Sequence, residues 1–167
     1  RRKVEAETLL GFAIEVYEHQ MRHGRHFLHE HPASATSWDL PKMMGLRKRK
    51  GVGEVVGHLC QYGLTTKAGG SQAPALKPTR FLSSAEEVLK LLGKRCPRDH
   101  EHQRLAQGRT RDAAIYPPEL CKAMLRGIEA QRRREGRAIC DTLRRDLDRG
   151  CAVYSLGREM GHESHEW

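Results

Sequence analysis

Aromatic residues and long apolar runs are scarce in this chain. Phe, Trp and Tyr make up 5% of the 167 residues, and all hydrophobic types together reach 38%. We therefore expect one domain of ordinary size with a modest core. No run of about 20 apolar residues and no secretory signal sequence is visible, which argues against a membrane span and against secretion. We expect an intracellular protein of the nucleus or cytoplasm.

Cysteines are few and irregularly spaced. An odd count at such spacings is not the framework of a small secreted domain held by disulfides. We therefore expect reduced thiols, which are free to pack in a core or to bind a metal ion. The five cysteines are Cys60, Cys96, Cys121, Cys140 and Cys151.

Positive charge is in excess. The chain has 30 Lys and Arg against 21 Asp and Glu, a formal net charge of +9. A positive surface potential favours polyanions, so nucleic acid is the leading expected partner. Arg132, Arg133 and Arg134 are consecutive in an Arg-rich stretch, and we expect them to contact phosphate. The alternative is a solvated helix face, because Glu129 and Glu135 lie at helical steps among these arginines.

Helical and extended patterns alternate along the first two thirds of the chain. Such alternation predicts an α/β fold, here a partial Rossmann-like, mostly parallel sheet of about three strands with flanking helices. An Arg-rich C-terminal helix follows. The expected elements are helices at 4–23, 41–50 and 85–92, strands at 25–29, 52–60 and 80–82, a loop at 65–78, and helical stripes from 117 to 149.

The same pattern suggests three regions. We expect the partial α/β domain at residues 1–115, a basic helical extension at 116–149, and a poorly ordered tail at 150–167. A three-stranded sheet is thin, and its edge would be exposed without further strands. This, together with a chain that opens on Arg1, predicts that the upstream part of a parent polypeptide is a partner of this segment.

One short loop carries metal-ligand chemistry. Cys96, His100 and His102 follow the third expected helix, and Cys60 ends the second expected strand. Cysteine and histidine are the ligands of structural zinc, and Cys60 would supply the fourth donor if the sheet brings it near. Because the spacing is not that of a standard zinc finger, unmetallated packing with surface histidines stays open as the alternative.

An acidic residue follows the first expected strand. Glu30 lies just before His31 and Pro32, at the carboxyl end of that strand. Ligand sites of open parallel sheets gather at this end, so Glu30 is a candidate for acid/base catalysis or for binding a base edge. The alternative is a residue that caps the turn through Ala33 and Ser34.

A second set of side chains is expected at the same rim as Glu30. Tyr62, Lys77 and Arg80 flank the loop between the second and third strands, and an aromatic ring beside two cations suits contacts to bases and phosphates. Gly69 and the glycine after it are not followed by the Gly-Lys-Ser/Thr of a phosphate-binding loop. An ordinary loop with solvated cations is the alternative.

Three segments together resemble a known domain. They are GRHFLHEHPASATSW at 24–38, CQYGL at 60–64 and KPTRFL at 77–82. This set is similar to a methyltransferase-like domain of retroelement-type polyproteins from unicellular algae. That domain is remotely similar to the C-terminal half of the cytosine-5 DNA methyltransferase catalytic fold. The resemblance implies that Glu30 contacts the target cytosine, with Arg80 as a second catalytic residue, although His31 stands where the family has Asn.

Two parts of such an enzyme are missing from the sequence. The resemblance implies a Gly-rich turn for S-adenosylmethionine and a Pro-Pro-Cys nucleophile, and Pro117-Pro118 precedes Glu119 instead of cysteine. We therefore expect S-adenosylmethionine only in an intact parent, and a fragment that associates with nucleic acid but is inactive alone. The alternative is a non-catalytic nucleic-acid-binding module of a mobile-element polyprotein, either steadied by zinc or free of metal.

Overall fold

The computed structural model describes residues 2–68, 71–103 and 115–136. The predicted helical stripe beyond Gly136 and the predicted tail at 150–167 lie outside this described part. The helices are α1 (Arg2–Arg22), α2 (Pro41–Arg47), α3 (Glu86–Leu92) and α4 (Pro118–Arg134), with short 3-10 turns η1 (Thr36–Asp39) and η2 (Leu59–Tyr62). The strands are β1 (Leu28–Pro32), β2 (Gly53–His58), β3 (Thr65–Ala68), β4 (Ser71–Pro74) and β5 (Pro78–Ser83).

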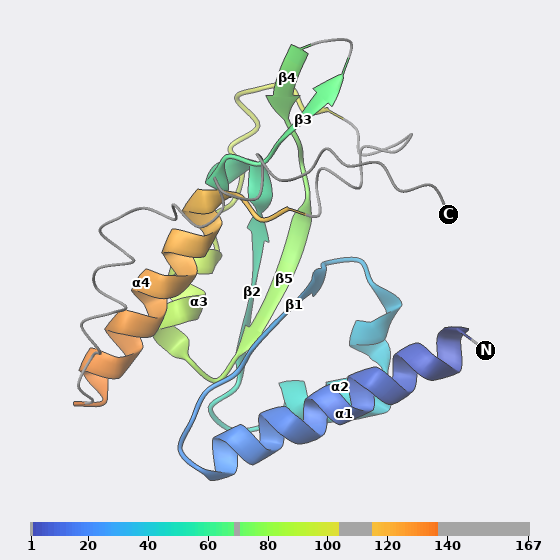
Figure 1. Ribbon diagram of the computed structural model, residues 1–167, viewed down its shortest axis with the longest axis vertical. Helices are drawn as coiled ribbons and strands as arrows, with labels where there is room; N and C mark the ends of the chain where they lie inside the picture. Colours follow the sequence, from blue (N-terminus) through green and yellow to red (C-terminus); the bar gives the residue numbers. More distant parts are fainter. Residues whose placement is uncertain (1, 69–70, 104–114, 137–167) are drawn as a thin grey trace, which may run out of the picture.

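The three-stranded sheet has the order β1-β5-β2, and β5 is antiparallel to both neighbours. The predicted Rossmann-like, mostly parallel sheet is therefore wrong. β1 and β2 run in the same direction, but β5 separates them. The reason lies in the connection from β2 to β5, which consists of η2 and the hairpin β3–β4 in place of a crossover helix (Figure 1). A parallel neighbour requires such a crossover.

The hairpin β3–β4 occupies a segment where the sequence predicts a loop. Thr65 pairs with Pro74 and Thr66 with Ala73 in an antiparallel ladder. Small polar residues hide the alternation of apolar and polar positions by which strands are recognised. Pro74 is tolerated because it ends its strand.

Side chains of β5 alternate between two cores. Phe81 points to one face of the sheet and Leu82 to the other, as the period of a strand requires. We call these the α3/α4 face and the α1/α2 face, after the helices that cover them (Figure 1). The α3/α4 core consists of Leu59, Tyr62, Leu64, Ala75, Phe81, Ala85, Val88, Leu89, Leu92 and Leu120. The α1/α2 core consists of Ile14, Phe27, Trp38, Met43, Leu46 and Leu82.

Helix α4 packs closely on α3. Leu120 is fully buried in the α3/α4 core, and Gly127 lies so near Val88 that an added Cβ would come within 2.6 Å of its Cα. The first half of the predicted basic extension therefore packs directly on the domain before it.

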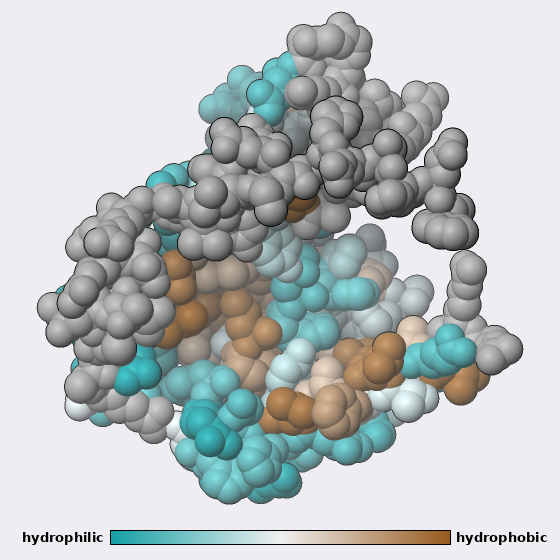
Figure 2. Space-filling model, viewed as in Figure 1, coloured by the Kyte–Doolittle hydropathy of each residue, from teal (hydrophilic) through white to brown (hydrophobic). Residues whose placement is uncertain are grey.

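Helix α1 buries one stripe and exposes another. Ile14 is buried, whereas Leu9, Phe12 and Val16 are exposed, and Figure 2 shows apolar residues interleaved with polar ones along this helix. Within the described residues, no helix is long and apolar enough to cross a membrane. The predicted intracellular location stays a prediction.

Candidate metal centre

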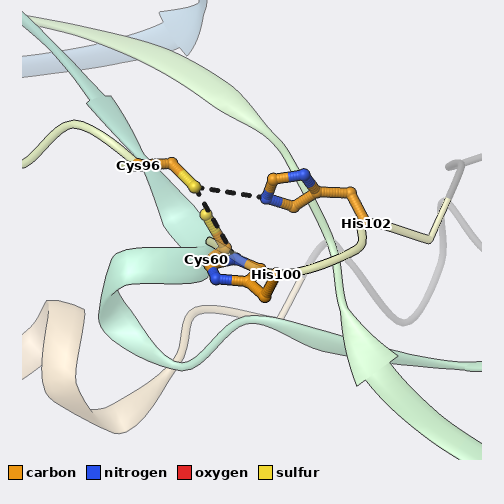
Figure 3. Close-up of side chains that lie close together, drawn as sticks. All are labelled: Cys60, Cys96, His100 and His102. Atoms are coloured by element: carbon orange, nitrogen blue, oxygen red, sulfur yellow. Dashed lines mark hydrogen bonds between the residues drawn. The ribbon is translucent and has the colours of Figure 1, made fainter. Parts of the chain in front are cut away.

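Four potential ligands gather at one end of the α3/α4 core. Cys60 lies in η2, and Cys96, His100 and His102 lie in the loop that follows α3. One ligand atom from each residue can be chosen so that all four lie within 4.8 Å of one another. Figure 3 shows the two sulfur atoms close together and both imidazole rings beside Cys96. The sequence prediction that these four residues meet is confirmed.

The distances between the ligand atoms fit a tetrahedral ion. The Cys96 Sγ lies 3.6 Å from His100 Nε2 and 3.4 Å from His102 Nε2. Zinc binds sulfur at about 2.3 Å and imidazole nitrogen at about 2.0–2.1 Å, so the S–N edge of a zinc tetrahedron measures about 3.5 Å. The sulfur and both nitrogens therefore already stand at the spacing that a Cys2His2 zinc site requires.

The turn around Cys96 wraps its sulfur. Arg98 has a positive φ of 63°, a conformation that non-glycine residues rarely adopt, and its N–H donates to Cys96 Sγ over 3.3 Å. The N–H of Cys96 donates to His58 Nδ1 over 3.1 Å. Such strained backbone persists where the surrounding structure fixes it, as it does at binding sites.

Both ends of the loop are anchored to the hairpin and the sheet. The N–H of Gln103 donates to the Pro74 carbonyl over 2.7 Å, and Gln103 forms a parallel bridge with Ala75. The N–H of His58 donates to the Lys94 carbonyl over 2.9 Å. The three ligands of the loop are therefore held by backbone contacts on either side.

An acidic neighbour orients one imidazole. Asp99 Oδ1 lies 2.7 Å from His100 Nδ1, while His100 Nε2 faces Cys96. A histidine that binds zinc through one nitrogen usually donates the other N–H to a carboxylate, which fixes the tautomer and raises the basicity of the ligand. Asp99 is thus placed as such a partner.

The surroundings of Cys60 and of the neighbouring His58 shift the pKa of each side chain. Burial, followed by a hydrogen bond with Cys96, raises the pKa of Cys60. Burial, followed by the charges of Arg95 and Arg98, lowers the pKa of His58. A raised thiol pKa does not suit a nucleophile, whereas a bound zinc ion would deprotonate the same thiol outright.

The number of ligands indicates a structural site. Cys60, Cys96, His100 and His102 are all partly buried. Four protein ligands complete a zinc tetrahedron, whereas a catalytic zinc site leaves one position for water or substrate. The chemistry that the arrangement supports is therefore cross-linking of two chain segments.

Glu30 and Arg80 do not share a rim. In the register of β1 and β5, Glu30 is opposite Phe81 and His31 is opposite Arg80, so the two predicted catalytic side chains point to opposite faces of the sheet. Glu30 accepts a hydrogen bond of 2.6 Å from the Tyr116 hydroxyl on the α3/α4 face.

On the α1/α2 face, Arg80 is engaged by two neighbours. Its guanidinium donates to Glu54 over 3.0 Å and lies 5.2 Å from the centre of the Trp38 ring. Hydrogen bonding to Arg47, followed by the charge of Arg80, overcomes partial burial and lowers the pKa of Glu54. The contacts of Arg80 are those of a structural ion-pair network.

The predicted base-stacking residue is buried. Tyr62 is 2% exposed, and its hydroxyl donates to the Leu91 carbonyl over 2.8 Å. Its ring therefore belongs to the α3/α4 core and offers no face for a base. Lys77 is partly buried, and its carbonyl accepts a hydrogen bond from the N–H of Leu59.

The arginines of α4 lie among acidic residues. Arg133 forms an ion pair with Glu129, and Arg134 pairs with Glu86 and Glu87 of α3. These contacts favour the alternative of an ion-paired helix face for both residues. Arg132 is partly buried on the same helix.

Sequence reasoning missed three residues that support these sites. Asp99 and His58 hold the metal loop, and Tyr116 holds Glu30. An acid directly before a candidate histidine ligand is a usable signal for Asp99. The roles of His58 and Tyr116 depend on tertiary contacts across 38 and 86 positions, which no local pattern reports.

Comparisons of the chain with protein-family models, curated proteins and solved structures found no match. The candidate metal centre therefore rests on its own geometry.

Proposed function

We propose that the chain is a small zinc-stabilised module that binds nucleic acid and is not itself a catalyst. The observation that carries the proposal is the meeting of Cys60, Cys96, His100 and His102, with sulfur-to-nitrogen distances suited to a tetrahedral ion. A Cys2His2 set is one of the standard ligand sets of structural zinc.

Two findings favour this module over a methyltransferase fragment. The antiparallel position of β5 removes the mostly parallel sheet on which the enzyme interpretation depended. Glu30 and Arg80 lie on opposite faces, where each has a partner in the fold. The family resemblance implies that the residues that bind S-adenosylmethionine lie upstream of this chain, so the proposal includes no site for this cofactor.

Zinc would join η2 to the loop after α3. Cys60 comes from the first segment and the other three ligands from the second, so one ion would connect β2 with the end of α3. Because the four ligands are brought together only in the folded chain, binding of the ion contributes directly to the free energy of folding.

Net charge supports the nucleic-acid partner. A formal charge of +9 on 167 residues gives a positive potential that attracts the phosphate backbone. Binding of this kind is insensitive to base sequence and weakens steeply as salt is added, because neutralised phosphates release their counterions.

The metal is tested by its stoichiometry. We expect about one zinc per purified chain by atomic emission, in keeping with a single four-ligand structural site. We expect Cys96→Ser to lose the metal. Cys121→Ser is the matched control, because Cys121 is a partly buried cysteine of α4 outside the cluster. Zinc retained in full by Cys96→Ser would contradict the proposal.

Thermal unfolding measures what the metal contributes. A ligand at a thousandfold excess over its Kd stabilises the folded state by about 4.1 kcal/mol. For a chain of this size that corresponds to a fall in Tm of about 10 °C on chelation. An unchanged Tm after complete removal of zinc would show that the metal does not hold the fold.

Nucleic-acid binding is tested by fluorescence anisotropy. Labelled duplex and single-stranded oligonucleotides of mixed sequence are titrated with the zinc-bound chain between about 50 and 200 mM salt, the range over which phosphate contacts lose most of their strength. We expect log Kobs to fall linearly with log salt concentration. Absence of binding at the lowest salt would overturn this half of the proposal.

A further inference from the structure

We propose that the turn around Cys96, from Lys94 to Arg98, is the surface that contacts the phosphate backbone, and that Arg133 and Arg134 of α4 are not. We call this segment the metal turn. The inference rests on the proposed function and identifies which part of the surface performs it.

The metal turn concentrates exposed cations. Lys94, Arg95 and Arg98 are exposed and lie within five consecutive residues. Across the described ranges 2–68, 71–103 and 115–136, no ion pair involves any of the three side chains. Asp99, the next residue, directs its carboxylate to His100. The three charges are therefore available to a polyanion without breaking a contact with a carboxylate.

Three cations of α4 are in a different situation. Arg133 pairs with Glu129, and Arg134 pairs with two carboxylates of α3. Lys122, on the same helix, pairs with Glu119. A phosphate that contacted these side chains would have to compete with a carboxylate already in place, which reduces the gain from each contact.

The metal turn is also held in position by the fold. The Lys94 ammonium lies 5.3 Å from the centre of the buried Tyr62 ring, and the Lys94 N–H donates to the Tyr62 hydroxyl over 3.3 Å. The Arg95 guanidinium lies 3.5 Å from His58 Nε2. Cations that are fixed before binding lose less conformational freedom when a partner arrives, so the free energy of association is more favourable.

Metal and nucleic acid should therefore act on one another. Cys96 is at the centre of the turn, between Arg95 and Arg98, and its sulfur accepts the Arg98 N–H. A zinc ion on Cys96 would fix the conformation in which both arginines are presented. By thermodynamic linkage, removal of the metal weakens nucleic-acid binding by the same factor as nucleic acid strengthens metal binding.

The decisive experiment compares two triple variants of the zinc-bound chain. Lys94→Ala/Arg95→Ala/Arg98→Ala removes three charges from the metal turn, and Lys122→Ala/Arg133→Ala/Arg134→Ala removes three from α4. Binding of a 20-base-pair duplex of mixed sequence is measured against salt. Each lost phosphate contact lowers the slope of log Kobs against log salt by about 0.9, so the metal-turn variant should lose about 2.7.

At about 100 mM salt we expect the metal-turn variant to bind more than tenfold more weakly, and the α4 variant to change less than threefold, because phosphate contacts dominate affinity at this salt. Zinc content and Tm are recorded for both variants. If the metal-turn variant loses zinc, the corresponding triple Gln variant, which keeps long polar side chains, replaces it in the comparison.

Three results separate the two levels of the proposal. Equal losses of duplex affinity in both variants would mean that binding depends on net charge and not on one surface. This result would overturn the inference while the proposed function stands. An unchanged metal-turn variant beside a weakened α4 variant would place the surface on the helix and also overturn it. No binding by the unaltered chain would contradict the proposed function itself.

Discussion

The two faces of the sheet are packed in different ways. On the α3/α4 face, Gly57 and Gly127 allow backbone to approach backbone, since a Cβ at Gly57 would come within 2.3 Å of the Leu92 carbonyl oxygen. On the α1/α2 face, polar contacts accompany the apolar core, such as the hydrogen bond of 3.0 Å between the Tyr17 hydroxyl and His29 Nδ1. The α3/α4 face excludes larger side chains at its glycine positions, whereas the packing of the α1/α2 face depends on contacts of aromatic and imidazole side chains.

This difference explains where the metal ligands lie. Cys60 lies between Leu59 and Tyr62 in the chain. Because both of these residues are buried in the α3/α4 core, the closely packed α3/α4 face determines the position of the Cys60 sulfur. Leu92, at the end of α3, is fully buried in the same core and precedes the loop with the other three ligands. The rigid side of the molecule therefore supports the candidate metal centre.

A pair of helix glycines tests the comparison most strongly. In Gly127→Ala the new Cβ meets the backbone of Val88 at 2.6 Å, which cannot move aside as a flexible side chain can. We expect a loss of about 2–3 kcal/mol in the free energy of unfolding, as for other overpacked sites. Urea denaturation provides the measurement.

Gly45→Ala in α2 is the matched control. No atom lies within 4 Å of a Cβ at Gly45, and alanine is the better helix former. The free energy of unfolding should rise by about 0.5–1 kcal/mol. If both substitutions had the same effect, the two faces would not differ in tightness and the comparison would fail.

A double-mutant cycle on Glu30 and Tyr116 is expected to have a smaller effect. A base-pocket role predicts that Glu30→Ala leaves stability nearly unchanged, whereas the hydrogen bond from Tyr116 predicts a loss. Hydrogen bonds to charged groups contribute about 1.5–3 kcal/mol, so Glu30→Ala and Tyr116→Phe should be coupled by about 1 kcal/mol or more. Additive losses would show that the pair does not act as a unit.

The smallest expected effect is a dependence of the free energy of unfolding on pH, which arises from His29 on the α1/α2 face. Burial, followed by the charge of His31, lowers the pKa of His29. As the pH falls, His29 is therefore protonated in the unfolded chain before it is protonated in the folded chain. The stability contributed by neutral His29 is present above about pH 6.5, the pKa of an unperturbed histidine, and is lost as the pH falls through the lowered pKa of the folded state.

Replacement by Gln removes this titration. Unfolding free energies of the original chain and of His29→Gln, compared between pH 7.5 and 5.5, should converge as the pH falls. Partial exposure of the imidazole keeps this change below about 1 kcal/mol. Because both proteins retain the metal ligands, acid release of zinc affects them equally. Parallel curves would show that His29 does not titrate differently in the folded state.

Several elements were predictable from local pattern. The stripe at 4–23 and the run at 85–92 predicted α1 and α3 to within two residues at each end. The direction of β5 was not predictable, because it depends on the connection from β2. That connection passes through a hairpin whose residues carry no apolar alternation, so the sequence suggested a loop and, with it, the wrong sheet.

The candidate metal centre and the predicted Glu30–Arg80 site also differ in how far local sequence predicts them. Cys96, His100 and His102 are neighbours in the chain, so their meeting could be inferred directly, and Cys60 joins them because β2 ends beside α3. The pairing of Glu30 with Arg80 depended on register. A shift of one residue reverses the face of every side chain, and no feature of the sequence fixes that register.

The position of Cys60 relative to Cys96 has a consequence for the unfolded chain. They are 36 positions apart, 96 minus 60, and the segment between them contains the hairpin, α3 and the central strand β5. An ion held by both sulfurs acts as a reversible cross-link that closes this loop, and chain entropy assigns such a closure about 4 kcal/mol. Because the four ligands come together only in the folded chain, binding of the ion offsets the entropic cost of this closure as β5 takes its place between its two neighbours.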